Sequence, residues 1–532
     1  MRRLAFMGQR SILIEQRSKE DYMKNNEHPW RVLAVLCLAV LMVVIDNTIV
    51  NVALPSLSRD LHASNSALQW IVDGYSLPFA ALMLAGGGLA DRLGRRLVMA
   101  AGLGSFVLFS AFAAFSHSVS TLLVARALMG AAAAFIFPAT LSIITVTFSN
   151  PKQRAAALGI WGATAGIAIA VGPIAGGELI THFWYGSIFL VNLPLGLLTL
   201  LAIALVVPES RNMLKRRFDF VGLILGTLGV FSLTLGIIEG PSWGWLNIGT
   251  LGVFTLALAN FAWFVRYEGR RQDPLFEVHI FRNPAFSAGA FSIAADFFLL
   301  FGFIFLVTQY FQLVKGYSAL SAGVRTLPFA GTVMITTPLG AILASKIGAR
   351  YVVPTGLVLM SGGLYWMSQL SAGSAYFGPV VGAMIVLATG FSLISAPSTA
   401  VTMSVLPSHQ VGAGAAVNET TRELGGTLGV AVLGSVFSSL FGPSVRTALL
   451  PYLHHGLTQH AINTAQSSMY AASVVVSKFP AQLQPSLHHS IVMAFMNGFH
   501  RACLVAAGVG IIVAIGGALT LPKGPLTNVE HP

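Results

Sequence analysis

Several charged side chains lie inside long apolar stretches of the sequence, where they could do chemistry. Asp46, Asp73 and Asp296 are carboxylic acids, and Arg126 is a cation. A charge inside a membrane costs roughly 3 kcal/mol unless it is paired or wetted, so each of these residues is a functional candidate. A carboxylate that alternates between dry and wet surroundings can take up and release a proton.

Helix geometry places two of these charges at a similar depth. Asp46 lies about 15 residues from the inner start of its apolar stretch, or about 22 Å at 1.5 Å per residue. Arg126 lies about 7 residues from the outer face, and hence about 20 Å from the inner face. We therefore predict that Asp46 binds the proton and that Arg126 is its modulating partner. A buried structural ion pair, or a carboxylate that caps a helix, is the alternative.

The other two acids have aromatic neighbours in the sequence, which are Trp70, Tyr75, Phe297 and Phe298. A carboxylate among aromatic rings can bind a lipophilic cation by charge and by ring contact. We predict that Asp73 and Asp296 contribute to such a site. Proton coupling is one alternative, and a structural ion pair with Arg325 or Arg501 is another.

Fourteen long apolar stretches must position these side chains. The chain has 532 residues, of which 55% are hydrophobic and 9% charged, whereas soluble proteins carry about 25% charged residues. A continuous apolar stretch of about 20 residues crosses the membrane as a helix. We predict an all-α integral membrane protein with spans near 32–54, 67–90, 97–116, 120–147, 153–178, 186–207, 218–239, 246–267, 285–311, 319–345, 350–371, 377–400, 411–438 and 491–521.

The distribution of basic residues orients the predicted spans. Most of the 31 Lys and Arg residues fall between spans on one side when the amino terminus is placed in the cytoplasm, which is the bias that membrane proteins show. We therefore predict that both termini are cytoplasmic. The net charge of +12 is explained by topology, and we expect no nucleic-acid partner.

An internal repeat predicts how the spans are grouped. The sequence GGLADRLGRR at 87–96 is similar to AILASKIGAR at 341–350. Parallel repeats are a transporter architecture with the substrate site between the halves. We predict six-helix halves at 32–207 and 285–521, two inserted helices within 208–284, and cytoplasmic tails at 1–31 and 522–532. An external loop at 439–490, rich in Ser, His, Gln and Pro, is predicted to be a solvated or amphipathic surface segment.

At these motifs the chain resembles the major facilitator superfamily, and within it the fourteen-helix drug:proton antiporter family. The resemblance rests on the loop motif from Gly87 to Arg96, on DNTIVNVALP at 46–55, on Leu122, Arg126 and Gly130, and on Gly172, Pro173, Gly176 and Gly177. NETTRELGGTLGVAV at 418–432 also agrees. Met129 and YGSIFLVN at 185–192 depart from the family pattern, which affects the details of substrate entry.

Two of these motifs have predicted mechanical roles. The loop residues Gly87, Asp91, Arg92, Gly94, Arg95 and Arg96 can form contacts at helix ends that break when the halves rock, so we predict a conformational latch, with simple topology as the alternative. In the motif of Gly172, Pro173, Gly176 and Gly177, small residues allow close helix approach, and proline removes a backbone hydrogen bond. We predict a gate or leak seal, with ordinary tight packing as the alternative.

The resemblance implies a proton-coupled antiporter that exports lipophilic, cationic drugs by alternating access. An exporter of an endogenous lipid, siderophore or other natural product on the same fold is the alternative. A membrane enzyme is disfavoured because no nucleophile elbow, H-E-x-x-H or cofactor fingerprint occurs in the sequence. ATP-driven transport by this chain is disfavoured because the sequence contains no Walker A motif. A receptor or channel on a transporter fold is a further class.

The predicted energy source is the proton gradient, with no cofactor and no metal. The predicted partners are the lipid bilayer, lipophilic small molecules and protons, and a monomer is the expected state. The predicted location is the inner membrane of a prokaryote.

Overall fold

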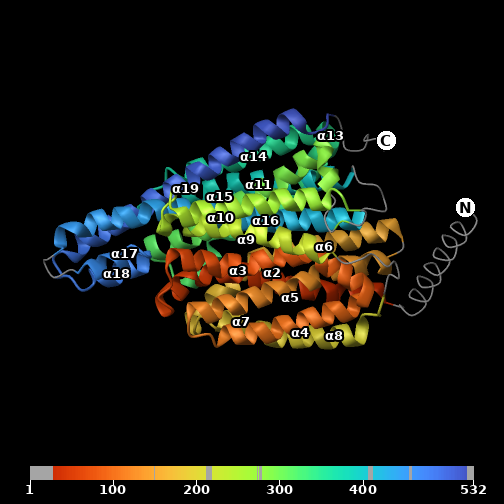
Figure 1. The fold of residues 1–532 in the computed structure, drawn as a ribbon, viewed down its shortest axis with the longest axis horizontal. Helices are drawn as coiled ribbons and strands as arrows, with labels where there is room; N and C mark the ends of the chain where they lie inside the picture. The colour runs from red at the N-terminus through yellow and green to blue at the C-terminus, as the bar shows by residue number, and fades with distance from the viewer. Residues whose placement is uncertain are drawn as a thin grey trace, which may run out of the picture.

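The computed structural model describes residues 28–148, 150–210, 219–271, 274, 278–404, 411–453 and 458–523. Within these ranges the chain forms a bundle of long, roughly parallel helices (Figure 1). This confirms the predicted all-α integral membrane fold. The predicted tails lie almost entirely outside the described residues.

The first half of the bundle comprises seven helices. They are α2 (Pro29–Asp60), α3 (Asn65–Leu93), α4 (Arg95–Ala114), α5 (Val119–Thr147), α6 (Pro151–His182), the short α7 (Ser187–Leu190) and α8 (Asn192–Val206). Local sequence sets their ends. The Ser64 side chain accepts a hydrogen bond from Ala67 N at the start of α3, and Ser118 forms a capping box with Thr121 at the start of α5.

The second half follows two inserted helices, α9 (Phe220–Trp243) and α10 (Ile248–Glu268). Its elements are η1 (Val278–Arg282), α11 (Pro284–Gln309), η2 (Tyr310–Val314), α12 (Ala319–Val324), α13 (Leu327–Ile347), α14 (Ala349–Met367), η3 (Tyr376–Val380), α15 (Val381–Ser404), α16 (Val411–Leu449) and α19 (Gln484–Thr520). Two glycines show the internal repeat directly. Gly94 between α3 and α4, and Gly348 between α13 and α14, have φ angles of +120° and +92°, a conformation that favours glycine.

Twelve helices of the described residues are long and apolar enough to cross a membrane. Each of the fourteen predicted spans coincides with a helix, but α3 and α14 are not among the twelve. The number of fourteen spans therefore stays a prediction, and so do the domain boundaries.

The predicted external loop 439–490 contains folded structure. The helices α16 and α19 extend into it, and it holds η4 (Leu450–Tyr452), α17 (Gln459–Ala465) and α18 (Met469–Val476). In Figure 1 α17 and α18 project from one end of the bundle, opposite the end at which α19 finishes. The segment also reaches the first half, because Asn65 N donates to Ser467 O at 2.8 Å.

The two halves contact each other at the end of the bundle from which α17 and α18 project. We call this end the closed end. There α3 packs against α16, and α6 packs against α12. A polar contact joins α2 to the second half, because Gln312 Nε2 donates to Val52 O at 2.8 Å. On the sequence-based orientation, the closed end is the outer end.

Candidate functional site

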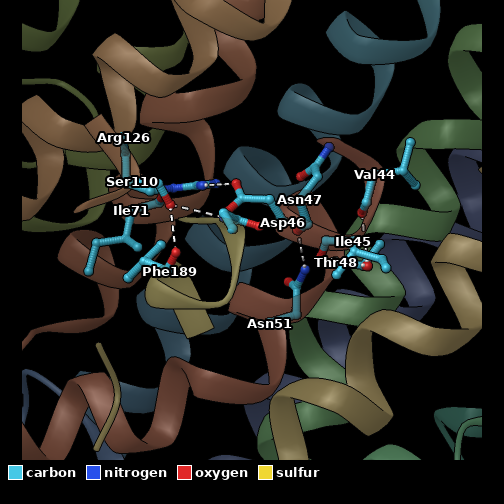
Figure 2. Close-up of polar contacts among 11 residues, drawn as sticks. Val44, Ile45, Asp46, Asn47, Thr48, Asn51, Ile71, Ser110, Arg126 and Phe189 are labelled. Carbon is cyan, nitrogen blue, oxygen red and sulfur yellow. Dashed lines mark hydrogen bonds and ion pairs between the residues drawn. The ribbon is translucent and has the colours of Figure 1, made fainter. Parts of the chain in front are cut away.

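An ion pair lies in the interior of the first half. Arg126 Nη1 of α5 donates to Asp46 Oδ2 of α2 at 2.7 Å, and both side chains are 0% exposed (Figure 2). The predicted pairing of these two residues is therefore present. A buried ion pair carries a large desolvation cost, which only good geometry and further hydrogen bonds can offset.

Further hydrogen bonds complete the surroundings of this pair. Asn192 Nδ2 of α8 donates to Asp46 Oδ1 at 2.7 Å and to Ser110 Oγ at 2.9 Å. Ser110 Oγ in turn donates to Phe189 O at 2.8 Å. Both oxygens of Asp46 thus accept a hydrogen bond. We did not predict Asn192 or Ser110; the signal available in the sequence was the one amide of the apolar stretch 186–207.

Arg126 is held on its other side by α3. Its Nε donates to Ile71 O at 3.1 Å, and its guanidinium carbon lies 4.2 Å from the centre of the Tyr75 ring. Ile71 and Tyr75 are four residues apart and so lie on one face of α3. Arg126 is therefore fixed by the chain whether or not Asp46 is ionised, and protonation of Asp46 would remove the charge attraction between them.

Asp73 and Asp296 lie buried without a hydrogen-bond partner among the described residues. Both side chains are 0% exposed, and neither carboxylate oxygen of either residue has a partner. The two arginines named as candidate partners are placed elsewhere. Arg325 lies over the Tyr317 ring at 4.0 Å, and Arg501 is exposed. Arg422 is the cation whose charge acts on Asp296.

The predicted aromatic residues do not gather at one place. The Trp70 indole nitrogen donates to Glu239 Oε1 of α9 at 2.9 Å, and the Tyr75 ring lies beneath Arg126. Phe297 contacts Arg422, whose guanidinium carbon lies 5.3 Å from the ring centre, while Phe298 is half-buried with its backbone against α16 at Gly429. Of the four rings, Phe297 is the one that lies beside both Asp296 in the sequence and a cation, Arg422, in the structure. A role in cargo binding stays a prediction for all four aromatic residues.

The loop from Gly87 to Arg96 is anchored by a residue that we did not predict. The Glu209 carboxylate accepts hydrogen bonds from Arg96 N at 3.2 Å and Leu97 N at 3.1 Å. It therefore caps the amino-terminal end of α4, where an anion is favoured. Arg95 N also donates to Ser210 O at 3.0 Å. The side chain of Asp91 is not among those that the structure describes. The latch contacts of Asp91 and Arg92 therefore stay a prediction.

The motif of Gly172, Pro173, Gly176 and Gly177 lies where α6 meets α2 and α12. A Cβ at Gly172 would lie 2.0 Å from Thr48 Oγ1, and one at Gly176 would lie 2.6 Å from Ile49 Cγ1. A Cβ at Gly177 would lie 2.5 Å from Leu320 Cα of the other half. Gly172 and Gly176 therefore let α6 pack closely against α2, and Gly177 lets it approach the backbone of α12 at the closed end, as small residues do between membrane helices.

A glycine of the second half gives a direct test of this closure. A Cβ at Gly323 would lie 2.2 Å from Pro173 O, which no small side-chain adjustment can relieve. Gly323→Ala should therefore force α12 away from α6 and reduce transport by roughly 10-fold or more, since overpacking commonly costs 1–3 kcal/mol. Gly331→Ala on α13 is the control, because no atom lies within 4 Å of its Cβ position. Equal transport rates in the two variants would contradict the tight-closure interpretation.

Comparison with known proteins identifies the class. The family model described as Major Facilitator Superfamily matches residues 36–430. The chain belongs to the major facilitator superfamily, and its relatives place it with the multidrug resistance and efflux proteins of the drug:proton antiporter type.

Two curated relatives span nearly the whole chain. The Tetracenomycin C resistance and export protein of Streptomyces glaucescens is 32% identical over 502 residues, covering 93% of this chain and 92% of the relative. The Methyl viologen resistance protein SmvA of Salmonella typhimurium is 32% identical over 504 residues, covering 93% and 98%.

Solved structures support the fold alone. A bacterial homologue of the human lysosomal transporter Spinster, in an inward-facing and unoccupied conformation, aligns with a TM-score of 0.66 at 17% sequence identity. The alignment covers 94% of this chain and 100% of that structure.

Proposed function

We propose that the protein exports lipophilic drugs, including cationic ones, in exchange for protons. The observation that carries the proposal is the fully buried Asp46–Arg126 ion pair inside a two-halved transporter fold. Such a pair has one member that can be neutralised by a proton, which is what coupling to a proton gradient requires. The similarity to resistance and export proteins supports drugs as the cargo.

The exchange follows from alternating access. When the protein opens outward, Asp46 binds a proton, and its attraction to Arg126 and its hydrogen bond with Asn192 are rearranged. When the protein opens inward, the proton leaves and the ion pair re-forms, as in the structure. Cargo moves in the opposite direction because it is bound and released in the other protonation state. The loop from Gly87 to Arg96 is proposed as the latch, and the glycine motif of α6 as the gate.

The membrane and orientation are part of the same proposal. Bacterial relatives favour the inner membrane, and the distribution of basic residues favours cytoplasmic termini. The closed end would then face outward, so cargo would reach the space between the halves from the cytoplasm or the inner leaflet.

A natural-product cargo is the second candidate. It is favoured by similarity to a protein named for the resistance to and export of tetracenomycin C. An endogenous lipid or siderophore would use the same fold, since fold does not determine cargo.

Purified protein in proteoliposomes tests the function. The vesicles hold the protein in the inside-out orientation, and their lumen is more acidic than the buffer. This proton gradient should drive lipophilic cargo into the vesicles, and cargo added to the buffer should cause protons to leave them. Accumulation that persists after an ionophore has collapsed the proton gradient would refute proton exchange. A panel of cations, neutral analogues and aromatic natural products would separate the two cargo classes.

The unpartnered acids test cation recognition. Asp296→Asn and Asp73→Asn should each weaken binding of a cationic cargo by roughly 10- to 150-fold and spare a neutral analogue, because a charge-assisted contact is worth about 1.5–3 kcal/mol. Asp60→Asn is the control, since Asp60 pairs with Arg59 near the end of α2. Equal losses for the two compounds, normalised to folded protein, would reject selective cation recognition.

A further inference from the structure

The inserted helix α9 contacts both halves at the closed end. It packs against α3 of the first half and against α16 of the second, and Figure 1 shows it running alongside both. The helices α3 and α16 also pack directly on each other: a Cβ at Gly434 of α16 would lie 2.6 Å from Gln69 Cδ of α3. Three helices therefore meet where the halves must part for the closed end to open.

Two hydrogen bonds attach α9 to α3 and α16, and their acceptors on α9, Ile237 and Glu239, are only two residues apart. Glu239 Oε1 accepts from the Trp70 indole of α3 at 2.9 Å. Ile237 O accepts from Ser435 Oγ of α16 at 2.5 Å. A helix is stiff over this distance, so α9 cannot keep both bonds when α3 and α16 separate.

The bond to α16 is the harder one to lose. The carbonyl of Ile237 would normally accept from the backbone nitrogen four residues later, but that residue is Pro241, which has no N–H. Ser435, which is 1% exposed, supplies the missing donor. Breaking this contact would leave the Ile237 carbonyl without a donor, which is costly in a membrane.

The bond to α3 is easier to release. Trp70 and Glu239 are only partly buried. Glu239 has a second donor on its own helix, because Ser242 Oγ donates to Glu239 Oε2 at 2.9 Å. The carboxylate therefore stays hydrogen-bonded after Trp70 has moved away.

We propose that α9 is a strap carried by the second half, and that the Trp70–Glu239 hydrogen bond ties it to the first half only while this end is closed. The bond then stabilises the closed state relative to the state that opens here. Trp70 thereby acts on the conformational balance rather than on cargo. The inference rests on the proposed alternating access, and it gives the inserted helices a mechanical task.

Distances between spin labels across the closed end test the strap without any cargo. Labels are placed at His117→Cys, between α4 and α5, and at Ala375→Cys, before η3, both of which are exposed. The background carries Cys37→Ser and Cys503→Ala, which remove the cysteines of the chain. The measured quantity is the ratio of long to short distances in folded, lipid-reconstituted protein.

Trp70→Phe keeps a ring against Phe231, which lies 5.8 Å from Trp70 between ring centres, but removes the N–H donor. It should raise the ratio of open to closed molecules roughly 10-fold, as loss of a hydrogen bond to a charged group predicts. Glu239→Gln keeps an acceptor without the charge and should raise the ratio less. Trp263→Phe on α10 is the matched control, because Trp263 is 63% exposed and should leave the ratio unchanged. Ser435→Ala should lower thermal stability instead.

An unchanged ratio in both Trp70→Phe and Glu239→Gln, or a shift towards the closed state, would overturn the strap. So would an equal shift in Trp263→Phe. Because the readout needs no transport, a normal shift in protein that fails to export would leave the strap standing and count against the proposed function. Normal proton-driven export together with an unchanged distance ratio would refute the strap and leave the proposed function standing.

Discussion

Asp46→Asn should abolish export against a gradient while exchange down a gradient continues. Asparagine has nearly the shape of aspartate, and its oxygen can still accept a hydrogen bond from Arg126 or Asn192, which contact Asp46 now. It cannot take up a proton, so the energy of the proton gradient is no longer available. Accumulation driven by a proton gradient, compared with counterflow of labelled cargo in the same vesicles, measures the two activities separately.

The control for this variant is another aspartate of the same helix. Asp60 pairs with Arg59 near the surface, and Asp60→Asn should retain proton-driven accumulation. The prediction fails if Asp46→Asn still gives a normal proton signal when cargo is added. The structural ion-pair alternative would then hold for Asp46.

Arg126→Met should have the second large effect, on folding. It leaves the Asp46 charge buried without its cation, and breaking a buried pair in this way typically costs about 3–5 kcal/mol. The yield of folded protein and the midpoint of thermal unfolding in detergent should both fall sharply. Asp46 would retain Asn192 as a donor, which offsets only part of the loss.

A double variant shows whether the loss comes from the unpaired charge. Asp46→Asn together with Arg126→Met has no buried charge left at this place, so its stability should recover much of what Arg126→Met loses. Losses that simply add would mean that Arg126 stabilises the fold mainly through Ile71 O and the Tyr75 ring. Export should be absent in both variants.

The sequence predicted the membrane bundle and the central pair because both depend on simple distances. A long apolar stretch must be a helix in lipid, and a rise of 1.5 Å per residue was enough to place Asp46 and Arg126 at one depth. The repeated loop likewise predicted two similar halves, and Gly94 and Gly348 occupy equivalent places between helices with similar φ angles.

The surroundings of the pair depend on helix rotation and packing, which the sequence does not display. Successive residues of a helix point about 100° apart. Trp70 and Tyr75, which are close in sequence to Asp73, therefore face different neighbours, α9 and Arg126 respectively. Asn192 and Glu209 reach partners more than 100 residues away, so only the folded bundle reveals them.

Among the residues that the structure describes, the hydrogen-bond partners of Asp46 come from the first half of the protein, through Arg126 and Asn192, whereas Asp296 lies in the second half beside α16. The proposed proton site and one proposed determinant of cargo choice thus lie in separate halves. On this proposal, substitutions around Asp296 change what is carried without disturbing the residues around Asp46. A single ancestral design can in this way diversify its cargo while its energy source stays the same.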